Sequence, residues 1–310
     1  MITVALSIPD PGRARWWVRH LAALLPELDV RLAQDVSEPD QVRYAVVWMP
    51  PHGLLAQWPR LHATVSIGAG VDHVVADPDY PMHVPIVRTV GPDMTQRMRE
   101  YVALHVLRFH RELPTLERDS TAGRWRPFVT PVAGQRRVGV LGMGHLGRAA
   151  ALTLHALGFQ VAGWSRSGGT PEGIEGFAKE RLEAFLARSE ILVCLLPLTA
   201  DTDNLLDEER LAMLPAGARL INAARGAHLD ERALSDALAS GHVGGATLDV
   251  FRTEPLPAEH PFRSEPNVLV TPHLASLIDP DSGARVIAAN LRRLEAGEPV
   301  ADAVWAGEYR

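Results

Sequence analysis

The sequence predicts an α/β protein of two domains, the second of which is built on a doubly wound parallel sheet. Three observations support this prediction. The chain has 310 residues, more than one compact core usually holds. Short apolar runs alternate with segments of helical periodicity along most of its length. A glycine-rich turn, GMGHLG at 142–147, lies between one apolar run and an Ala- and Leu-rich segment.

The first half contains three apolar runs that we expect to be strands, at residues 2–7, 44–49 and 64–69. Between the first two runs, Trp17 and Leu21 recur at helical spacing after a Pro-Gly pair, which predicts a helix. These elements indicate a small α/β domain.

A long helix is expected next, from Pro92 to about Leu116. Apolar side chains at Met98, Val102 and Phe109 follow one face of it. We interpret this helix as the crossover between the two domains.

The second half contains six apolar runs separated mostly by helical segments. Their near-continuous hydrophobicity is typical of parallel strands that are covered on both faces, so we expect a doubly wound sheet. The six runs are 137–142, 159–164, 190–197, 218–223, 245–250 and 267–272.

The composition is that of a soluble globular protein. There are 37 acidic residues against 31 lysines and arginines, and the net charge of -6 argues against nucleic acid or an anionic membrane as partner. No apolar run approaches the roughly 20 residues of a membrane span. The chain opens directly on a strand-like segment, and its single cysteine, Cys194, lies in an apolar run. We therefore expect a cytoplasmic protein without disulfides.

The turn at 142–147 has the G-x-G-x-x-G pattern of dinucleotide-binding domains. Gly142 permits the tight turn, Gly144 lets the backbone approach a pyrophosphate, and Gly147 lets helix and strand pack closely. The free N–H groups of His145 and Leu146 would then face the anion at the start of the helix. This pattern predicts a Rossmann cofactor domain.

The end of the next strand indicates which dinucleotide binds. NAD is usually held by an acid about 20 residues beyond the glycines, whereas NADP prefers an arginine. Here Ser165, Arg166 and Ser167 occupy that place and no carboxylate is present. We expect NADP(H) to be preferred and NAD(H) to be the alternative.

Three polar residues follow apolar runs of the same half: Arg225 in NAARG, Glu254 in LDVFRTEP and His273 in TPHLAS. With the glycine turn, these segments occur in the order found in the D-isomer-specific 2-hydroxyacid dehydrogenase family, which the chain resembles over nearly its whole length. The segments VWMPP, IGAGVDHV, WSRS and LRRLEAGEPV are most similar to its short, NADPH-preferring glyoxylate/hydroxypyruvate reductases.

The resemblance implies that Arg225, Glu254 and His273 are the catalytic trio. Reduction of a 2-keto acid to a 2-hydroxy acid needs a hydride and a proton, and a histidine suits the proton transfer. Glu254 would orient the imidazole and favour its protonated form. Arg225 would bind the substrate carboxylate and polarise the keto oxygen.

Further residues are assigned by the same resemblance. Asp249 is expected near the nicotinamide carboxamide, and the backbone of Ala69 and Gly70 near the substrate carboxylate. Trp48 is expected as one wall of the substrate pocket. The expected cofactor contacts also include Pro197 and Ala223.

The resemblance also predicts the domain organisation. Residues 1–97 and 276–310 would form a flavodoxin-like substrate-binding domain, and residues 98–275 the dinucleotide-binding domain. The amphipathic segment 283–294 would pack on the first domain. The long helix and the arm that follows it favour a homodimer.

Two alternatives remain open at this point. The substrate could be another 2-hydroxy acid of the same family, because a pocket discriminates a single methylene by only about 1–3 kcal/mol. The chain could also be a dinucleotide-binding scaffold without turnover, since the fold alone does not prove catalysis. No metal is expected, because the histidines show no metal-binding spacing.

Overall fold

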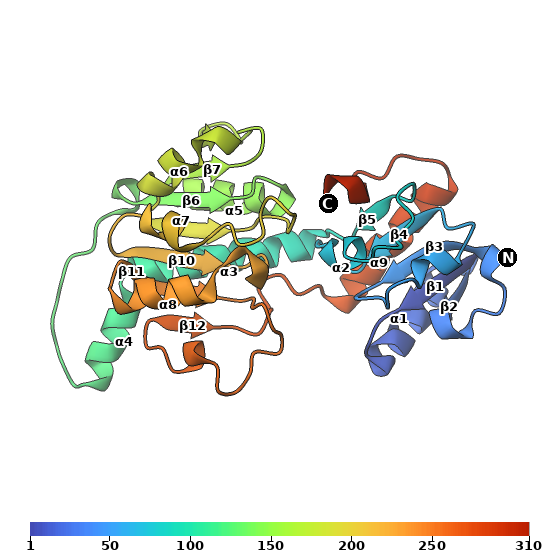
Figure 1. Ribbon diagram of the computed structural model, residues 1–310, viewed down its shortest axis with the longest axis horizontal. Coiled ribbons are helices and arrows are strands. Elements are labelled where there is room, and N and C mark those ends of the chain that lie inside the picture. The colour runs from blue at the N-terminus through green and yellow to red at the C-terminus, as the bar shows by residue number, and fades with distance from the viewer. Residues whose placement is uncertain (310) are drawn as a thin grey trace. The chain divides into compact units, whose positions relative to one another are not determined.

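The computed structural model describes residues 1–309, which divide into two compact units (Figure 1). Unit 1 contains Met1–Met94 and Leu277–Arg310, and unit 2 contains Thr95–Ser276. The domain divisions expected after residues 97 and 275 lie within three residues of these boundaries. Within residues 1–309, no helix has both the length and the apolar character that a membrane span requires.

Unit 2 contains a seven-stranded parallel sheet in the order β12-β11-β10-β9-β6-β7-β8. Counted from β6, this is the Rossmann order 3-2-1-4-5-6 with one further strand, and the order reverses between β6 and β9. The predicted doubly wound parallel sheet is therefore confirmed. The strands are β6 (Arg137–Leu141), β7 (Gln160–Trp164), β8 (Glu175–Phe177), β9 (Ile191–Cys194), β10 (Ala218–Asn222), β11 (Val243–Leu248) and β12 (Val268–Val270).

Helices cover both faces of this sheet. Successive residues of a strand point to opposite faces, so their side chains pack in two different clusters. In β9, Ile191 and Val193 pack in the cluster of α3 and α5, whereas Leu192 and Cys194 pack in the cluster of α6, α7 and α8. The helices are α3 (Pro92–His110), α4 (Leu113–Thr121), α5 (His145–Ala156), α6 (Leu182–Arg188), α7 (Glu208–Ala212) and α8 (Glu231–Ala239).

The expectation of one helix from Pro92 to about Leu116 is wrong. Helix α3 ends at His110, and α4 begins three residues later, after Glu112 in the left-handed region at φ +51°. Pro114 is the second residue of α4. In a continuous helix its ring would clash with the His110 carbonyl and would leave that carbonyl without a donor.

Unit 1 contains a six-stranded sheet in the order β13-β5-β4-β3-β1-β2, parallel except for β13. Its first five strands have the flavodoxin order 2-1-3-4-5, as expected. The short strands β2, β5 and β13 were not predicted from the sequence. The strands are β1 (Thr3–Ser7), β2 (Asp29–Leu32), β3 (Val42–Val47), β4 (Ala63–Ser66), β5 (Ile86–Arg88) and β13 (Ala303–Val304).

Helix α9 (Pro280–Glu295) packs against α1 (Pro11–Leu24) in unit 1, and the short α2 (Asp72–Val75) follows β4. The buried face of α9 includes Ile287 and Leu291. The Arg292 side chain of α9 reaches Glu27, with Nε 2.8 Å from the carboxylate. The chain after Leu277 thus completes the core of unit 1.

Candidate active site

The turn between β6 and α5 depends on two glycines. Gly142 has φ +99°, and a Cβ atom there would lie 2.6 Å from the carbonyl oxygen of Leu195. A Cβ atom on Gly147 would lie only 1.8 Å from the Gly142 carbonyl oxygen. Any side chain at these positions would collide with backbone, so the tight turn and the close packing of α5 require glycine.

Gly144 behaves differently. It caps α5, and a Cβ atom there would meet nothing within 4 Å. The first N–H groups of a helix, here those of His145 and Leu146, have no intrahelical acceptor. The His145 ring itself bonds Thr95, at 3.0 Å. Open space beside free N–H groups at a helix N-terminus fits a pyrophosphate.

The turn after β7 fits a phosphate group. Arg166 is exposed, and the hydroxyl of Ser165 is buried without a hydrogen-bond partner among residues 1–309. Ser167 bonds the Gly169 N–H, at 3.4 Å. The nearby Asp201 carboxylate pairs with Lys179 at 2.7 Å, and this pairing, assisted by the charge of Arg166, lowers its pKa. The turn therefore offers a guanidinium and a free hydroxyl.

A second guanidinium adjoins this turn, which the sequence analysis missed. Arg148 donates from Nε to the Met143 carbonyl at 2.9 Å and reaches the Gly169 carbonyl with its terminal nitrogen at 3.5 Å. One side chain thus links the glycine turn to the turn after β7. The partners are 21 residues apart along the chain, so no local pattern indicates the contact.

Glu254 and His273 form a close pair on the loops that follow β11 and β12. His273 Nδ1 lies 2.7 Å from Glu254 Oε2, and both side chains are about one-third or more exposed. The other Glu254 oxygen accepts the Phe251 N–H at 2.9 Å. Burial opposes ionisation of Glu254, but the hydrogen bonds from His273 and Phe251 and the charge of Arg225 outweigh it and lower its pKa.

The buried carboxylate of Asp249 holds the turn that carries His273. One oxygen accepts the Thr271 hydroxyl at 2.5 Å and the Leu274 N–H at 2.9 Å, and the other accepts the Ala275 N–H at 2.8 Å. His273 adopts φ +53° and donates its own N–H to the Asp249 carbonyl. These bonds fix an unfavourable backbone conformation at the histidine. The expected contact of Asp249 with a nicotinamide carboxamide stays a prediction.

Arg225 follows β10 and is held by its neighbours. The Arg225 carbonyl accepts a hydrogen bond from the Asn222 amide at 3.0 Å. A Cβ atom on Gly226 would lie 1.9 Å from the Phe251 carbonyl carbon, so the chain passes close to the loop after β11. The guanidinium donates to the Ala224 carbonyl at 2.7 Å.

His228 is a buried residue of this region that the sequence analysis missed. Its two ring nitrogens lie 3.1 Å from the Arg225 carbonyl and 3.3 Å from the Pro197 carbonyl. The ring thereby connects the loop after β10 with the loop after β9, where the expected cofactor contact Pro197 is exposed. Ala223, another expected contact, is buried at the end of β10.

The expected substrate residues Trp48, Ala69 and Gly70 belong to unit 1. Trp48 follows β3, and Ala69 and Gly70 lie in the loop after β4. The Trp48 ring packs on His73, with ring centroids 4.6 Å apart. Trp48 thus contacts α2, which follows this loop, while its contact with substrate stays a prediction.

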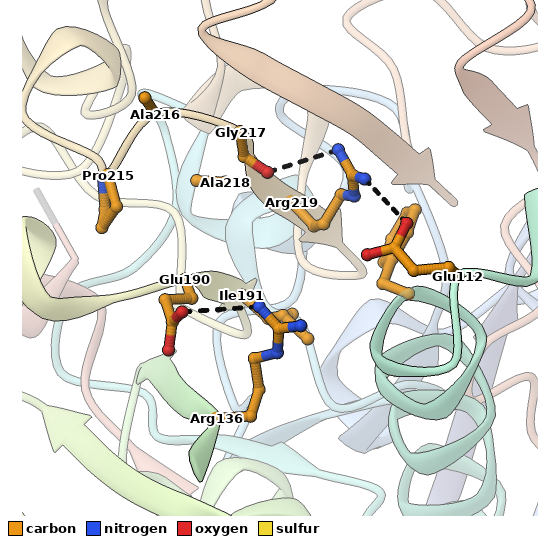
Figure 2. A pocket seen from close by; sticks show the side chains of 10 residues that line it. Glu112, Arg136, Glu190, Ile191, Pro215, Ala216, Gly217, Ala218 and Arg219 are labelled. Carbon is orange, nitrogen blue, oxygen red and sulfur yellow. Dashed lines mark hydrogen bonds and ion pairs between the residues drawn. The ribbon is translucent and has the colours of Figure 1, made fainter. Parts of the chain in front are cut away.

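A pocket at the opposite edge of the unit 2 sheet does not fit the expected chemistry (Figure 2). It lies at the amino ends of β9 and β10, whereas ligands of such sheets bind at the carboxyl ends. Its two arginines already have carboxylate partners: Arg136 faces Glu190 at 3.4 Å, and Arg219 faces Glu112 at 3.2 Å. Among residues 1–309, no cluster of His, Cys, Asp and Glu is arranged to hold a metal ion.

Comparison with known proteins identifies the family. Residues 103–275 match the NAD binding domain of the D-isomer specific 2-hydroxyacid dehydrogenases. The chain belongs to this family. The family resemblance predicted from the sequence motifs is therefore confirmed.

Several members of the D-isomer specific 2-hydroxyacid dehydrogenase family cover almost the whole chain. A glyoxylate/hydroxypyruvate reductase A from Serratia proteamaculans is 40% identical over 94% of this chain and 95% of its own length. The solved structure of a family member from Xanthobacter autotrophicus Py2, in complex with NADPH and MES, is 48% identical with a TM-score of 0.92, covering 100% and 99% of the two chains.

A third relative is the NADPH-dependent glyoxylate/hydroxypyruvate reductase from Sinorhizobium meliloti, solved with NADP and sulfate. It is 36% identical, with a TM-score of 0.89, and covers 100% of both chains. Whole-chain similarity thus supports the family membership, the two-sheet fold and the class of enzyme.

The two kinds of glycine predict different effects of substitution. Gly144→Ala adds a methyl group into open space, so the free energy of unfolding should change by no more than about 1 kcal/mol. The same methyl group would lie where the pyrophosphate approaches, so the Kd for NADPH should rise at least tenfold. Gly147→Ala should instead lower stability by roughly 1–3 kcal/mol, because its Cβ collides with backbone. Calorimetry and fluorescence titration test both, and unchanged NADPH binding by Gly144→Ala would contradict the assignment.

The Glu254–His273 pair predicts a pH effect. Because the pKa of Glu254 is lowered, the parent retains the carboxylate charge throughout the neutral range and loses it only below the usual range of a glutamate. Glu254→Gln removes the charge that stabilises a protonated ring, so keto-acid reduction should fail at a lower pH than in the parent. Rate profiles between pH 5 and pH 9 measure this shift. Glu259→Gln, at an exposed acid of the same loop, is the control.

Proposed function

We propose that the chain is an NADPH-dependent reductase of small 2-keto acids, glyoxylate and hydroxypyruvate among them. The observation that carries this proposal is the Glu254–His273 pair at 2.7 Å, on loops at the carboxyl ends of a Rossmann sheet. It is supported by the named activity of the relatives that match nearly the whole chain.

His273 is the proton donor in this proposal. Its Nδ1 is engaged by Glu254, which leaves Nε2 to face the substrate. In the reduction a hydride adds to the carbonyl carbon and a proton from Nε2 adds to the keto oxygen, which gives the 2-hydroxy acid. Bound NADPH supplies the hydride.

Arg225 binds the substrate carboxylate and stabilises negative charge on the keto oxygen. The guanidinium keeps its charge at any physiological pH and offers several donors in one plane. For unit 1 we propose that the backbone N–H groups of Ala69 and Gly70 bind a substrate carboxylate and that Trp48 lines the substrate pocket.

The buried Cys194 is a structural thiol, and we propose a cytoplasmic location.

The proton-transfer role is tested by His273→Asn. The variant should bind NADPH with a Kd within twofold of the parent, since the histidine does not hold the cofactor. Its kcat on glyoxylate and hydroxypyruvate should fall by roughly 10²- to 10⁴-fold, the usual contribution of a general acid. His155→Asn, at an exposed histidine of α5, is the matched control.

Steady-state assays of the parent complete this test. Reduction of glyoxylate, hydroxypyruvate, pyruvate and phenylpyruvate is measured with NADPH and with NADH. Turnover of phenylpyruvate alone would favour another substrate of the family. Tight NADPH binding without any turnover would favour a scaffold, and parental turnover in His273→Asn would exclude that residue as the donor.

Cofactor preference is assigned to the turn after β7. Arg166 holds the 2′-phosphate of NADPH, with the hydroxyls of Ser165 and Ser167. Arg166→Ala removes a charge-assisted contact of about 1.5–3 kcal/mol, so the KM for NADPH should rise roughly tenfold to a hundredfold. The KM for NADH should stay within twofold of the parental value. The control is Arg232→Ala, at an exposed arginine of α8, and equal losses for both cofactors would contradict the assignment.

We also propose that the chain forms a homodimer through α4 and the segment that follows it. Trp125 is 95% exposed and Val129 is 98% exposed, in a stretch without helix or strand that Figure 1 shows leaving the rest of unit 2. Other exposed apolar side chains of α3, α4 and this stretch are Leu104, Leu113, Leu116, Phe128 and Val132. So many exposed apolar side chains on neighbouring segments of the chain favour an interface.

The homodimer predicts a two-chain mass for the parent in sedimentation equilibrium. Trp125→Ala with Val129→Ala should raise the dimer dissociation constant at least tenfold, because large aromatic side chains dominate interface energies. Trp305→Ala, at a half-exposed tryptophan of unit 1, should leave the mass unchanged. A monomeric parent would refute the homodimer.

A further inference from the structure

A chain of hydrogen bonds in unit 1 connects His73 to the loop after β4. The Met49 N–H lies 3.3 Å from His73 Nδ1, and His73 Nε2 lies 3.1 Å from the Ser66 hydroxyl. Ser66 is fully buried, and its hydroxyl lies 2.8 Å from the Gly70 carbonyl oxygen. Four residues thus form one continuous path: Met49 after β3, His73 in α2, Ser66 at the end of β4 and Gly70 in the loop after β4.

The two ends of this path fix every donor and acceptor in it. A backbone N–H only donates, so the Met49 amide requires His73 Nδ1 to accept. The neutral ring then carries its proton on Nε2 and donates it to Ser66. A backbone carbonyl only accepts, so the Ser66 hydroxyl donates to Gly70. The path therefore has one direction, from Met49 to Gly70.

The loop after β4, at the Gly70 end of this path, has backbone N–H groups that are free to donate. Among residues 1–309, the N–H groups of Ala69 and Gly70 make no hydrogen bond. The Gly68 carbonyl accepts the Thr89 N–H at 3.3 Å, which fixes the peptide unit that contains the Ala69 N–H. Ser66 fixes the peptide unit after Gly70. The Gly70 N–H lies on the one peptide unit between these two, so both free donors are held in place.

The Trp48 side chain contacts both ends of this arrangement, the His73 ring and the backbone of the loop after β4. Its ring packs on the His73 ring at an interplanar angle of 61°. A Cβ atom on Gly68 would lie 2.8 Å from the same indole, so the loop backbone also rests against it. The imidazole and the loop are thereby supported by one aromatic side chain.

We infer that His73 is a positioning residue for the substrate carboxylate. It acts through Ser66, which holds the loop so that the Ala69 and Gly70 N–H groups are preorganised for an anion. This inference rests on the proposed function, because it takes the carboxylate of a 2-keto acid as the ligand of the loop. His73 itself does not touch the substrate in this role.

His73→Phe tests the inference because it keeps an aromatic ring against Trp48 and removes both ring nitrogens. The KM for glyoxylate should rise threefold to tenfold, as expected for the loss of a neutral hydrogen bond, while kcat and the Kd for NADPH stay within twofold. Ser66→Ala should give the same pattern. His73→Gln, whose amide can donate to Ser66, should recover most of the parental KM. His83→Phe, at an exposed histidine of unit 1, is the control.

Two measurements do not depend on turnover. Hydrogen–deuterium exchange of the amides at 68–71 should be faster in His73→Phe than in the parent, without any ligand bound. Calorimetric titration of the NADP complex with oxalate, a small dicarboxylate probe, should show threefold to tenfold weaker binding in that variant.

The outcomes separate this inference from the proposed function. The role of His73 would be overturned, while the parent still reduces keto acids, by any of three results for His73→Phe. These are amide exchange at 68–71 equal to that of the parent, oxalate affinity equal to that of the parent, or a loss of activity confined to kcat. A parent that neither binds oxalate nor reduces any keto acid would overturn the proposed function and this inference with it.

Discussion

The buried carboxylate of Asp249 is the constraint on which the arrangement of the site depends. It follows β11 and takes three hydrogen bonds from the turn between Thr271 and Ala275, including two from backbone N–H groups. These bonds hold His273 at φ +53°, a conformation that few non-glycine residues adopt. Without them the imidazole would have no fixed direction, and its pairing with Glu254 would depend on a mobile loop.

The parallel sheet then determines which groups lie together. Strands β10, β11 and β12 are neighbours and run in the same direction, so Arg225, Glu254 and His273 all follow their carboxyl ends. The order of the strands reverses between β6 and β9, and the glycine turn lies at that point. One set of loops therefore carries both the free helix N-terminus and the ionisable groups. In unit 1 the loop after β4 is likewise held by side chains of its neighbours, Ser66 of β4 and His73 of α2.

Much of the fold could be predicted because buried strands have a strong sequence signal. The six apolar runs of the second half correspond to β6, β7 and β9–β12. Strands β2, β5, β8 and β13 were missed because each has only two to four residues and lies at or next to a sheet edge. The break between α3 and α4 was missed because Leu113 and Leu116 continue the apolar spacing. Pro114 overrides that spacing, since its ring cannot sit inside the helix.

The sequence by itself determined the chemical inventory of this protein: the three glycines, the arginine turn after β7, and an arginine, a glutamate and a histidine each following a strand. It could do so because local turns demand glycine and because parallel strands bring their carboxyl ends to one edge. The tertiary structure alone decided how these groups are held. The contacts of Arg148 with Gly169, His228 with Pro197 and Met49 with His73 join residues 21 to 31 positions apart. No local periodicity encodes such contacts, because they arise only when separate loops are brought together by the sheets.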